Sequence, residues 1–342
     1  MKPDAISIVE AAYDSEADER TWFRRLLEQA GPKLDRGFGV TLSTYAPNMR
    51  PEEARFETYL MGQEKVDAAR AMIASDPDTF HRAFSPAAPS LAPHCVTSET
   101  MGLTQEEART WRPYVEFMHP LGIREILGLQ ARDPSGCVIF FSAPAPDLRR
   151  PTGQERICWR RIAAHISAGA RLRRAVEELS GDALAAGVDA VLTPSGAMVH
   201  GEKAAQSTDD RESLRRAAKG IDRARSKARS NEDEALNLWQ GLVAGRWSLV
   251  EQFDSDGRRF MIARRNDPQV TDPRALNLRE RQVLAYVAMG HPLKLIAYSL
   301  GVSTSSVSVN RKSGMRKLGL HTHADVVRLF APALPSEPPQ DR

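Results

Sequence analysis

The spacing of apolar residues in the first half of the chain changes repeatedly between helical and strand periods. A broken helical segment is expected over residues 4–30, and a long helix is expected from Thr152 to Leu179. In that helix, Ile157, Ile162 and Ile166 are expected to face inward. Apolar or alternating stretches between the helices predict strands over residues 37–45, 54–61, 123–131 and 136–142. The pattern therefore predicts an α+β domain that ends in a long helix.

A second run of strands and helices begins at Val188. The segments VDAVLTPSGAMVH and WSLVEQFDSDGRRFMIARR each predict two strands joined by a turn. Between them, helices are expected from Asp209 to Lys227 and from Glu232 to Val243. This order predicts a second, smaller α+β domain. Asp254 and Asp256 resemble a calcium loop only superficially, because the other ligands are absent, and a surface turn is expected there.

Three short helices are predicted close to the C-terminus. Asn277 is a suitable N-cap for the first helix, and Glu280, three positions on, can complete a capping box. Pro292 begins the second helix, Gly301 supplies a tight turn, and Ser303 can cap the third helix. Apolar residues at helical spacing give each helix one buried stripe. The sequence therefore predicts a helix-turn-helix.

The outer face of the third helix carries short or cationic side chains, which are Ser305, Ser308, Val309, Lys312 and Arg316. Such a face suits the DNA major groove, where small side chains allow close approach and Lys or Arg reach guanine acceptors or phosphates. Cations beside the groove are expected to contact phosphates, which positions the protein but reads no sequence. These cations are Lys294, Arg311 and Lys317.

This segment resembles the LuxR/NarL-type helix-turn-helix domain. The matching positions are Leu276, Arg279-Glu280, Val283-Leu284, Gly290, Lys294, Ile296-Ala297, Leu300, Ser303, Val307 and Lys317-Leu318. Carried over by position, the resemblance implies groove contacts for Ser308, Val309 and Lys312, and phosphate contacts for Lys294 and Lys317. The complete set of expected DNA-binding residues is Lys294, Ser303, Thr304, Ser305, Ser308, Val309, Arg311, Lys312, Arg316 and Lys317.

The segment departs from the family pattern at six positions, none of which removes a positive charge or a fold element. They are Asn277, Gln282, Leu295, Ser306, Asn310 and Gly314. Gly314 is the most unusual, because a glycine inside a helix costs about 1 kcal/mol relative to alanine. Tyr286 or Tyr298 is expected to fill the space that its missing side chain leaves.

Positive charge is concentrated in the same segment. Residues Asp272 to Phe330 hold nine Lys+Arg and three Asp+Glu, whereas the rest of the chain holds 38 basic and 41 acidic residues. This local excess suits contact with phosphates, although a small helical bundle with an ordinary basic surface is the alternative. Asp210 to Arg229 is also rich in basic residues. It is interpreted as a solvated helix face, with an auxiliary DNA or partner surface as the alternative.

On element order alone, residues 5–178 resemble a GAF-like sensory domain, and the region from Val188 resembles part of a PAS-like fold. The predicted architecture is an α+β sensory region followed by an all-α helix-turn-helix domain. Its expected boundaries are 1–179 for the GAF-like domain, 180–265 for the PAS-like domain, 266–275 for a linker, 276–331 for the helix-turn-helix domain and 332–342 for a disordered tail. GAF-like domains commonly hold a small ligand against the sheet. The residues expected to line such a pocket, unless they are simply core, are Phe38, Tyr45, Trp111, Phe117 and Phe140.

Composition narrows the remaining classes of protein. A chain of 342 residues with 42% hydrophobic and 27% charged residues, no long apolar run and no secretion signal at its start suits a cytoplasmic globular protein that has no membrane contact. Cys95, Cys137 and Cys158 form no Cys-x-x-Cys pair, so neither a disulfide nor a metal site is expected, although a redox-active thiol stays open. His94-Cys95 is interpreted as a loop or core feature, and no cofactor is expected.

The sequence contains no phosphate-binding loop, nucleophile elbow, zinc-protease motif or dinucleotide glycine fingerprint. A receiver-domain pattern is also absent, so a ligand, a protein partner or a redox change is the expected signal. The sequence therefore predicts a non-enzymatic transcriptional regulator that binds double-stranded DNA. It is expected to act as a homodimer through a fourth helix that carries Ala324, Val327 and Leu329. The alternatives are a sigma-factor-like protein that works with RNA polymerase, and a ligand- or partner-binding protein whose helical domain no longer reads DNA.

Overall fold

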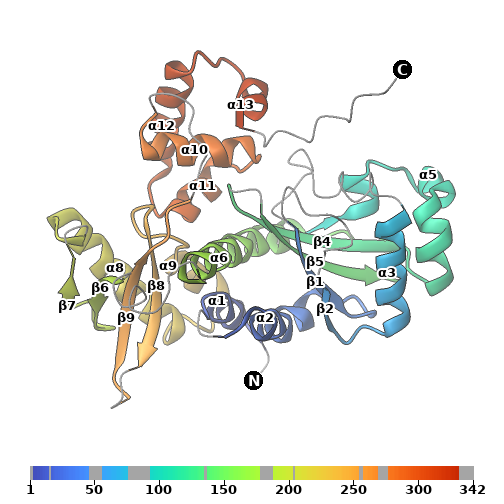
Figure 1. Ribbon diagram of the computed structural model, residues 1–342, viewed down its shortest axis with the longest axis horizontal. Coiled ribbons are helices and arrows are strands. Elements are labelled where there is room, and N and C mark those ends of the chain that lie inside the picture. Colours follow the sequence, from blue (N-terminus) through green and yellow to red (C-terminus); the bar gives the residue numbers. More distant parts are fainter. Residues whose placement is uncertain are drawn as a thin grey trace.

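Two antiparallel sheets with their helices precede a separate group of C-terminal helices in the computed structural model (Figure 1), which confirms the predicted α+β region followed by an all-α domain. The structure describes residues 3–14, 17–45, 56–75, 93–134, 137–177, 188–202, 205–253, 257–268 and 276–330. Several predicted features lie outside these residues, in whole or in part. They are the turn at residues 135–136, the turn at Asp254 and Asp256, most of the linker and the C-terminal tail.

The first sheet has five antiparallel strands in the order β2-β1-β5-β4-β3. They are β1 (Val40–Tyr45), β2 (Phe56–Tyr59), β3 (His94–Cys95), β4 (Glu125–Arg132) and β5 (Val138–Ala145). Alternation along the strands separates the two faces: Phe141 is buried in the main core, whereas its neighbours Phe140 and Ser142 line a cavity on the opposite face. Strand β5 therefore contributes both to the core and to a possible binding site.

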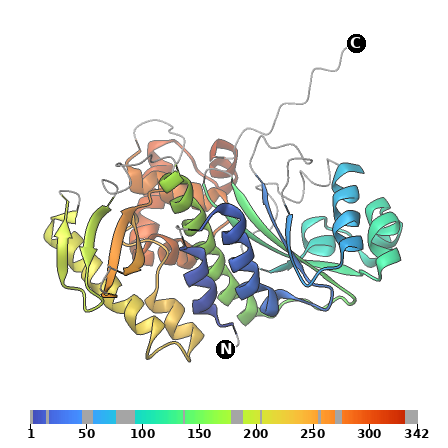
Figure 2. The ribbon, with the colours of Figure 1, turned by 60° about the horizontal axis from the view of Figure 1, so that its bottom comes forward.

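Helices cover both faces of this sheet (Figures 1 and 2). The core face packs on α1 (Ala5–Ala12), α2 (Glu19–Leu34) and α6 (Gly153–Glu177). The cavity face is closed by α3 (Gln63–Ser75), η2 (Val96–Thr100), α5 (Gln105–Thr110), η3 (Tyr114–Met118) and η4 (His119–Leu121). The boundaries of α6 nearly match those predicted from its apolar stripe.

One predicted core position in α6 is wrong. Ile162 and Ile166 are buried as expected, but Ile157 is half exposed. Ile157 precedes Ile162 by five residues, which rotates it far around the helix from the stripe formed by residues spaced three or four apart. Trp159, three residues before Ile162, occupies the buried position instead.

The second sheet has four antiparallel strands in the order β7-β6-β9-β8. They are β6 (Val188–Leu192), β7 (Met198–Gly201), β8 (Trp247–Phe253) and β9 (Arg259–Arg265), with α8 (Thr208–Arg225) and α9 (Glu232–Leu238) packed on one face. Leu192 and Met261 of this sheet are fully buried in the same apolar cluster as α1 and α6. The two sheets therefore share one continuous core.

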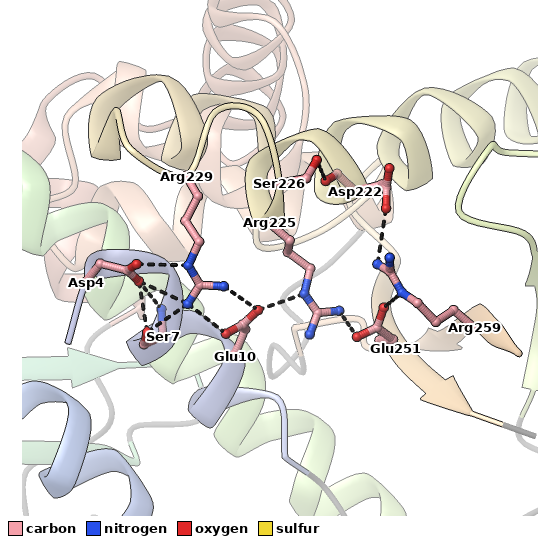
Figure 3. Close-up of polar contacts among 9 residues, drawn as sticks. All are labelled: Asp4, Ser7, Glu10, Asp222, Arg225, Ser226, Arg229, Glu251 and Arg259. Carbon is pink, nitrogen blue, oxygen red and sulfur yellow. Dashed lines mark hydrogen bonds and ion pairs between the residues drawn. The ribbon is translucent and has the colours of Figure 1, made fainter. Parts of the chain in front are cut away.

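A chain of ion pairs also joins the two α+β parts (Figure 3). Arg229 binds Asp4 and Glu10 of the N-terminal segment, with Nε 2.9 Å from Asp4 Oδ2. Arg225 of α8 reaches Glu10 at 2.7 Å and also binds Glu251 of β8. The C-terminal end of the basic segment 210–229 is therefore engaged in holding the two parts together, a role that neither interpretation of the segment had included.

The C-terminal domain has its own core. Its helices are α10 (Leu278–Ala288), α11 (Leu293–Leu300), α12 (Thr304–Lys317) and α13 (His323–Phe330). Val283, Ile296, Val307 and Val326 are completely buried where the four helices meet, and Leu242 of the preceding region joins them. No helix among the described residues is long and apolar enough to cross a membrane.

Candidate nucleic-acid interface

The predicted capping box at the start of α10 is confirmed. Asn277 Oδ1 accepts a hydrogen bond from the Glu280 backbone N–H at 2.8 Å, and the Glu280 carboxylate accepts one from the Asn277 N–H at 2.9 Å. The same carboxylate accepts hydrogen bonds from Ser313 Oγ at 2.7 Å and Lys317 Nζ at 2.8 Å. Burial raises the pKa of Glu280, but the bonds from Lys317 and Ser313 outweigh it and hold the pKa below its usual value. Lys317, expected at a phosphate, is thus paired with α10.

The turn between α11 and α12 has the predicted form. Gly301 ends α11 in the left-handed region, with φ +63°, where a side chain would be strained. Ser303 then caps α12 by accepting a hydrogen bond from the Ser306 N–H at 3.1 Å. Val307 packs fully buried on the inner side, so this turn fixes which face of α12 points outward.

Gly314 is required for the close crossing of α10 and α12, and the expectation that an aromatic residue fills its space is wrong. A Cβ atom at this position would lie 2.8 Å from Leu284 Cδ1 and 3.4 Å from Glu280 Cβ. Leu284 therefore occupies the space. Tyr286 and Tyr298 pack toward the N-terminal region instead.

The outer face of α12 is open to solvent. Thr304, Ser305, Val309, Lys312 and Arg316 are exposed, and Ser308 and Arg311 are half-buried. Within the part of the chain that the structure describes, no ion pair involves Lys312, Arg316 or Arg311. We call the row Ser305, Ser308, Val309, Lys312 and Arg316 the outer face of α12. Each member has another member three or four residues away, so they lie on one side of the helix.

The other predicted cation, Lys294, is exposed in the first turn of α11. Ser303 is exposed as well, although its hydroxyl is already bonded to the start of α12. Among the ion pairs within the described residues, Lys317 is the one predicted DNA-binding residue that takes part, and its partner is Glu280.

The scaffold helices α10 and α11 attach the domain to the rest of the protein. Tyr298 Oη donates to the Trp239 carbonyl at 2.8 Å and lies 2.7 Å from His165 Nε2 of α6. On α10, Arg279 donates to the Ala244 carbonyl and Gln282 donates to the Gly245 carbonyl at 3.1 Å. Figure 1 shows α11 against α6 and α12 farther from it. The docked surface and the outer face of α12 are therefore different surfaces of one domain.

His165 is the centre of the contact on α11. Its side chain is completely buried, and its Nδ1 atom lies 3.2 Å from Tyr13 Oη of α1. Burial lowers the pKa of His165 to about 3, so the ring is neutral at physiological pH. His291, between α10 and α11, packs 4.9 Å from the ring of Tyr286, and burial and the charges of Arg132 and Arg160 lower its pKa to about 3 as well.

An apolar cavity of about 110 Å³ lies between the first sheet and the helices on its cavity face. Of the residues predicted to line it, Trp111, Phe117 and Phe140 do so. Phe38 and Tyr45 are not part of the lining. Phe38 precedes β1, and its ring centroid lies 4.9 Å from Lys65 Nζ. Tyr45 is the last residue of β1. The lining residues that sequence reasoning missed include Met61, Met72, Met101 and Met118, which come from separate elements and share no sequence pattern.

The three cysteines are free thiols. Cys95 pairs within the sheet beside His94, and both side chains are buried, in agreement with the interpretation as a core feature. Burial, together with Glu125 and Glu99, raises the pKa of Cys95 to about 11, and burial raises that of Cys158 to about 11. Such thiols are poorly ionised at neutral pH and therefore weak nucleophiles.

Comparison with known families gives a match over α10 to α13. Residues 274–330 match the family described as bacterial regulatory proteins, luxR family. Comparison with curated protein sequences gives no match. A structure of Escherichia coli SdiA is similar over 92% of this chain and 90% of its own, with 10% identity and a TM-score of 0.32. A complex of SdiA with octanoyl-rac-glycerol covers 96% and 95%, with 11% identity and a TM-score of 0.35. TM-scores this low do not establish a common fold for the whole chain.

Proposed function

Because residues 274–330 form a helix-turn-helix domain of the luxR family of bacterial regulatory proteins, we propose that the chain is a sequence-specific transcriptional regulator. The outer face of α12 is the observation that supports this proposal. It combines small side chains with Lys312 and Arg316, both exposed and free of ion pairs among the described residues. DNA as the partner places the protein in the cytoplasm, and this role requires no catalysis.

In the proposed complex, α12 enters the major groove with its outer face. Ser305 and Ser308 near its start allow close approach, and Lys312 reaches base acceptors deeper in the groove. Lys294 contacts a phosphate beside the groove and so positions the domain. Lys317 remains with Glu280, because breaking that bond would leave a buried carboxylate unpaired.

Two chains bind together in this proposal, and each places one α12 in successive major grooves. Half-sites are then about 34 Å apart along the DNA. The predicted pairing helix is present as α13, where Val326 faces the domain core while Leu329 and Ala324 are exposed. Ala324 and the half-buried Val327, three residues apart on α13, offer apolar surface to the second copy.

Control by the N-terminal region follows from how the C-terminal domain is attached. Tyr298 of α11 contacts His165, and His165 lies on the long helix α6, which also packs under the first sheet. A small apolar ligand in the cavity beside Trp111, Phe117 and Phe140 would act on the sheet above α6. We propose that such a ligand changes the position of the C-terminal domain and thereby the geometry of the two α12 helices.

Selection of bound genomic DNA fragments by the purified full-length protein tests the proposal. The wild type is compared with Lys312→Ala and with Arg24→Ala, which removes an exposed cation from α2, outside the proposed interface. Enrichment of a two-fold symmetric site that Lys312→Ala loses and Arg24→Ala keeps is the expected result. Equal enrichment by all three proteins would contradict the assignment of α12.

Two other outcomes correspond to the alternative functions. Co-purification with core RNA polymerase would indicate a sigma-factor-like role. Enrichment of no DNA at low salt by folded protein, with or without an apolar ligand, would indicate a ligand- or partner-binding protein whose helical domain has lost DNA reading.

A further inference from the structure

A second cavity in the N-terminal region is polar and lies outside the proposed DNA and apolar-ligand sites. It has a volume of about 640 Å³ and lies between η2, α5, η3 and the segment after β5. Thr97 lines both this polar cavity and the apolar one, so the two are neighbours. The residues at its inner end are Thr97, Ser98 and Glu125.

Glu125 places a buried negative charge at the wall of the polar cavity. Glu125 is only 3% exposed. Its Oε1 atom accepts hydrogen bonds from the backbone N–H groups of Thr97, at 2.9 Å, and Ile126, at 2.8 Å. Across the described residues, no hydrogen bond reaches its Oε2 atom and no ion pair involves Glu125. A buried carboxylate without a cationic partner is costly, which favours binding of a positive group from outside.

The hydroxyl groups of Thr97 and Ser98, next to Glu125 in the cavity lining, also lack hydrogen-bond partners among the described residues. Thr97 is 4% exposed, and neither its Oγ1 atom nor Ser98 Oγ has a hydrogen-bond partner in the part of the protein that is described. Leaving a buried hydroxyl without a hydrogen bond is unfavourable, because the group has lost its bonds to water. Glu125 Oε2 and the two buried hydroxyl oxygens are thus three acceptors without a donor among the described residues, and all three belong to residues that line the inner end of the cavity.

The rim of the polar cavity carries the opposite charge. Arg109 of α5 and Arg124, next to Glu125, are exposed, and among the described residues neither makes an ion pair. Asp147 is the one carboxylate that faces them from the rim among the described lining residues, and His119 is also there. Leu103, Val115 and Leu148 add apolar surface to the lining.

We propose that the polar cavity binds a free α-amino acid with an apolar side chain. An ammonium group has three N–H donors and no acceptor, which matches Glu125 Oε2, Thr97 Oγ1 and Ser98 Oγ. The ligand carboxylate then meets the guanidinium groups of Arg109 and Arg124, which bind carboxylates well. Leu103, Val115 and Leu148 cover the side chain. The proposal rests on this cavity alone and holds whether or not the protein binds DNA.

Other ligand classes fit the cavity less well. A metal ion would need more ligands, and the described residues contain no group of three or more His, Cys, Asp or Glu side chains that could hold one. An inorganic anion would suit the two arginines but would leave Glu125 Oε2 and the two hydroxyl oxygens without donors. Only a molecule that carries both charges satisfies both ends.

Calorimetric titration of the full-length protein with L-leucine tests the proposal. Two compounds serve as ligand controls: 4-methylpentanoate lacks the ammonium group, and 3-methylbutylamine lacks the carboxylate. L-Leucine is expected to bind at least tenfold more tightly than either. Binding of 4-methylpentanoate or of inorganic phosphate as tight as that of L-leucine would overturn the proposal in favour of an anion site at the rim, and absence of L-leucine binding would also overturn it.

Protein variants then locate the site. Glu125→Gln keeps an oxygen that can accept from the Thr97 and Ile126 N–H groups, so the fold is expected to persist while L-leucine binding weakens at least tenfold. Thr97→Val, which removes only a hydroxyl, is expected to weaken binding severalfold. Asp147→Asn at the rim is the control and is expected to bind as tightly as the wild type or more tightly. Unchanged binding by folded Glu125→Gln would overturn the proposal.

Discussion

Two faces of the C-terminal domain differ in what satisfies their polar groups. The outer face of α12 exposes Lys312 and Arg316, which lack ion pairs among the described residues, whereas the face formed by α10 and α11 is bonded to α6 and to residues 239–245. Cations without partners on one face are available to phosphates and bases. The bonded face instead fixes the position of the domain. The protein therefore holds its helix-turn-helix domain by α10 and α11, and leaves open the outer face of α12, for which we propose DNA reading.

The largest loss of stability is expected for Gly301→Ala, which disturbs the contact between the end of α11 and Leu242. A Cβ atom at this position would overlap the carbonyl oxygen of Leu242, and the φ of +63° adds left-handed strain. Gly290→Ala is the matched control, because it has a φ of +77° but nothing within 4 Å of an added Cβ. Both variants should lose about 1–2 kcal/mol through strain, and Gly301→Ala should lose a further 1–3 kcal/mol through overpacking.

Urea unfolding of the two variants measures this difference. Limited proteolysis shows in addition whether Gly301→Ala releases the C-terminal domain from the N-terminal region. Equal stability loss and equal protease sensitivity would mean that the contact with Leu242 does not hold the domain in place.

The second largest effect is the dependence of protein stability on pH, which is expected from the two buried histidines beside α10 and α11. His165 and His291 have folded pKa values of about 3, below the ordinary histidine value of 6.5, so the unfolded chain binds more protons between these two values. The stability that the protein gains from keeping these two histidines neutral is therefore fully present above pH 6.5 and is lost as the pH falls toward 3. At pH 5.5 the expected loss is about 1.4 kcal/mol for each histidine, because one pKa unit corresponds to about 1.4 kcal/mol.

Unfolding free energies at pH 7.5 and 5.5 measure this loss. His291→Phe provides the control, because His291 makes no hydrogen bond among the described residues and packs against Tyr286. The variant should lose only about half as much stability on acidification as the wild type. An identical pH dependence in both proteins would show that His291 does not contribute.

Substitutions of two adjacent residues of α12, Arg316 and Lys317, are expected to affect different properties. Lys317→Ala leaves the buried Glu280 carboxylate without its cation and should destabilise the domain by about 1–3 kcal/mol. Arg316→Ala removes an exposed side chain and should change stability by less than about 0.5 kcal/mol while weakening DNA binding. Denaturation and gel-shift titration of both variants check this. The reverse result would move Lys317 back to the DNA interface.

The smallest effect is expected for Lys294→Ala. Loss of one phosphate contact should weaken binding to all DNA sequences alike and reduce the slope of log affinity against log salt by about one. Titrations at several salt concentrations, on a selected site and on unrelated DNA, measure that slope. A change confined to the selected site would instead indicate that Lys294 reads bases.

Local signals in the sequence were sufficient to predict the caps and the turn of the helix-turn-helix. The capping box of Asn277 and Glu280, the turn at Gly301 and the cap at Ser303 each involve residues within four positions of one another, and all three are confirmed. The same holds for the two α+β regions, whose alternating strands lie close to the predicted positions. Hydrogen bonds and periodicity at this range depend on neighbouring residues and are visible without a fold.

Contacts between distant segments could not be predicted in this way. Gly314 appeared to need an aromatic neighbour but lies against Leu284, and Lys317 appeared free for phosphate but pairs with Glu280, 37 positions away. Phe38 and Tyr45 have the right chemistry for the apolar cavity yet lie outside its lining. Which side chains meet across such separations depends on helix crossing and strand order, which one-dimensional spacing does not encode.

The sequence by itself determined that an α+β region precedes a helix-turn-helix domain, because local periodicity and caps are properties of short segments. Only the tertiary structure decided which cations remain available, because that depends on whether folding brings a carboxylate to them, as it does for Lys317 and not, within the described residues, for Lys312. The tertiary structure likewise decided that Tyr298 meets His165, 133 positions away, and that Glu125 ends a polar cavity. Burial and partnership are set by the whole fold, and they govern both the pKa values and the open binding groups of this protein.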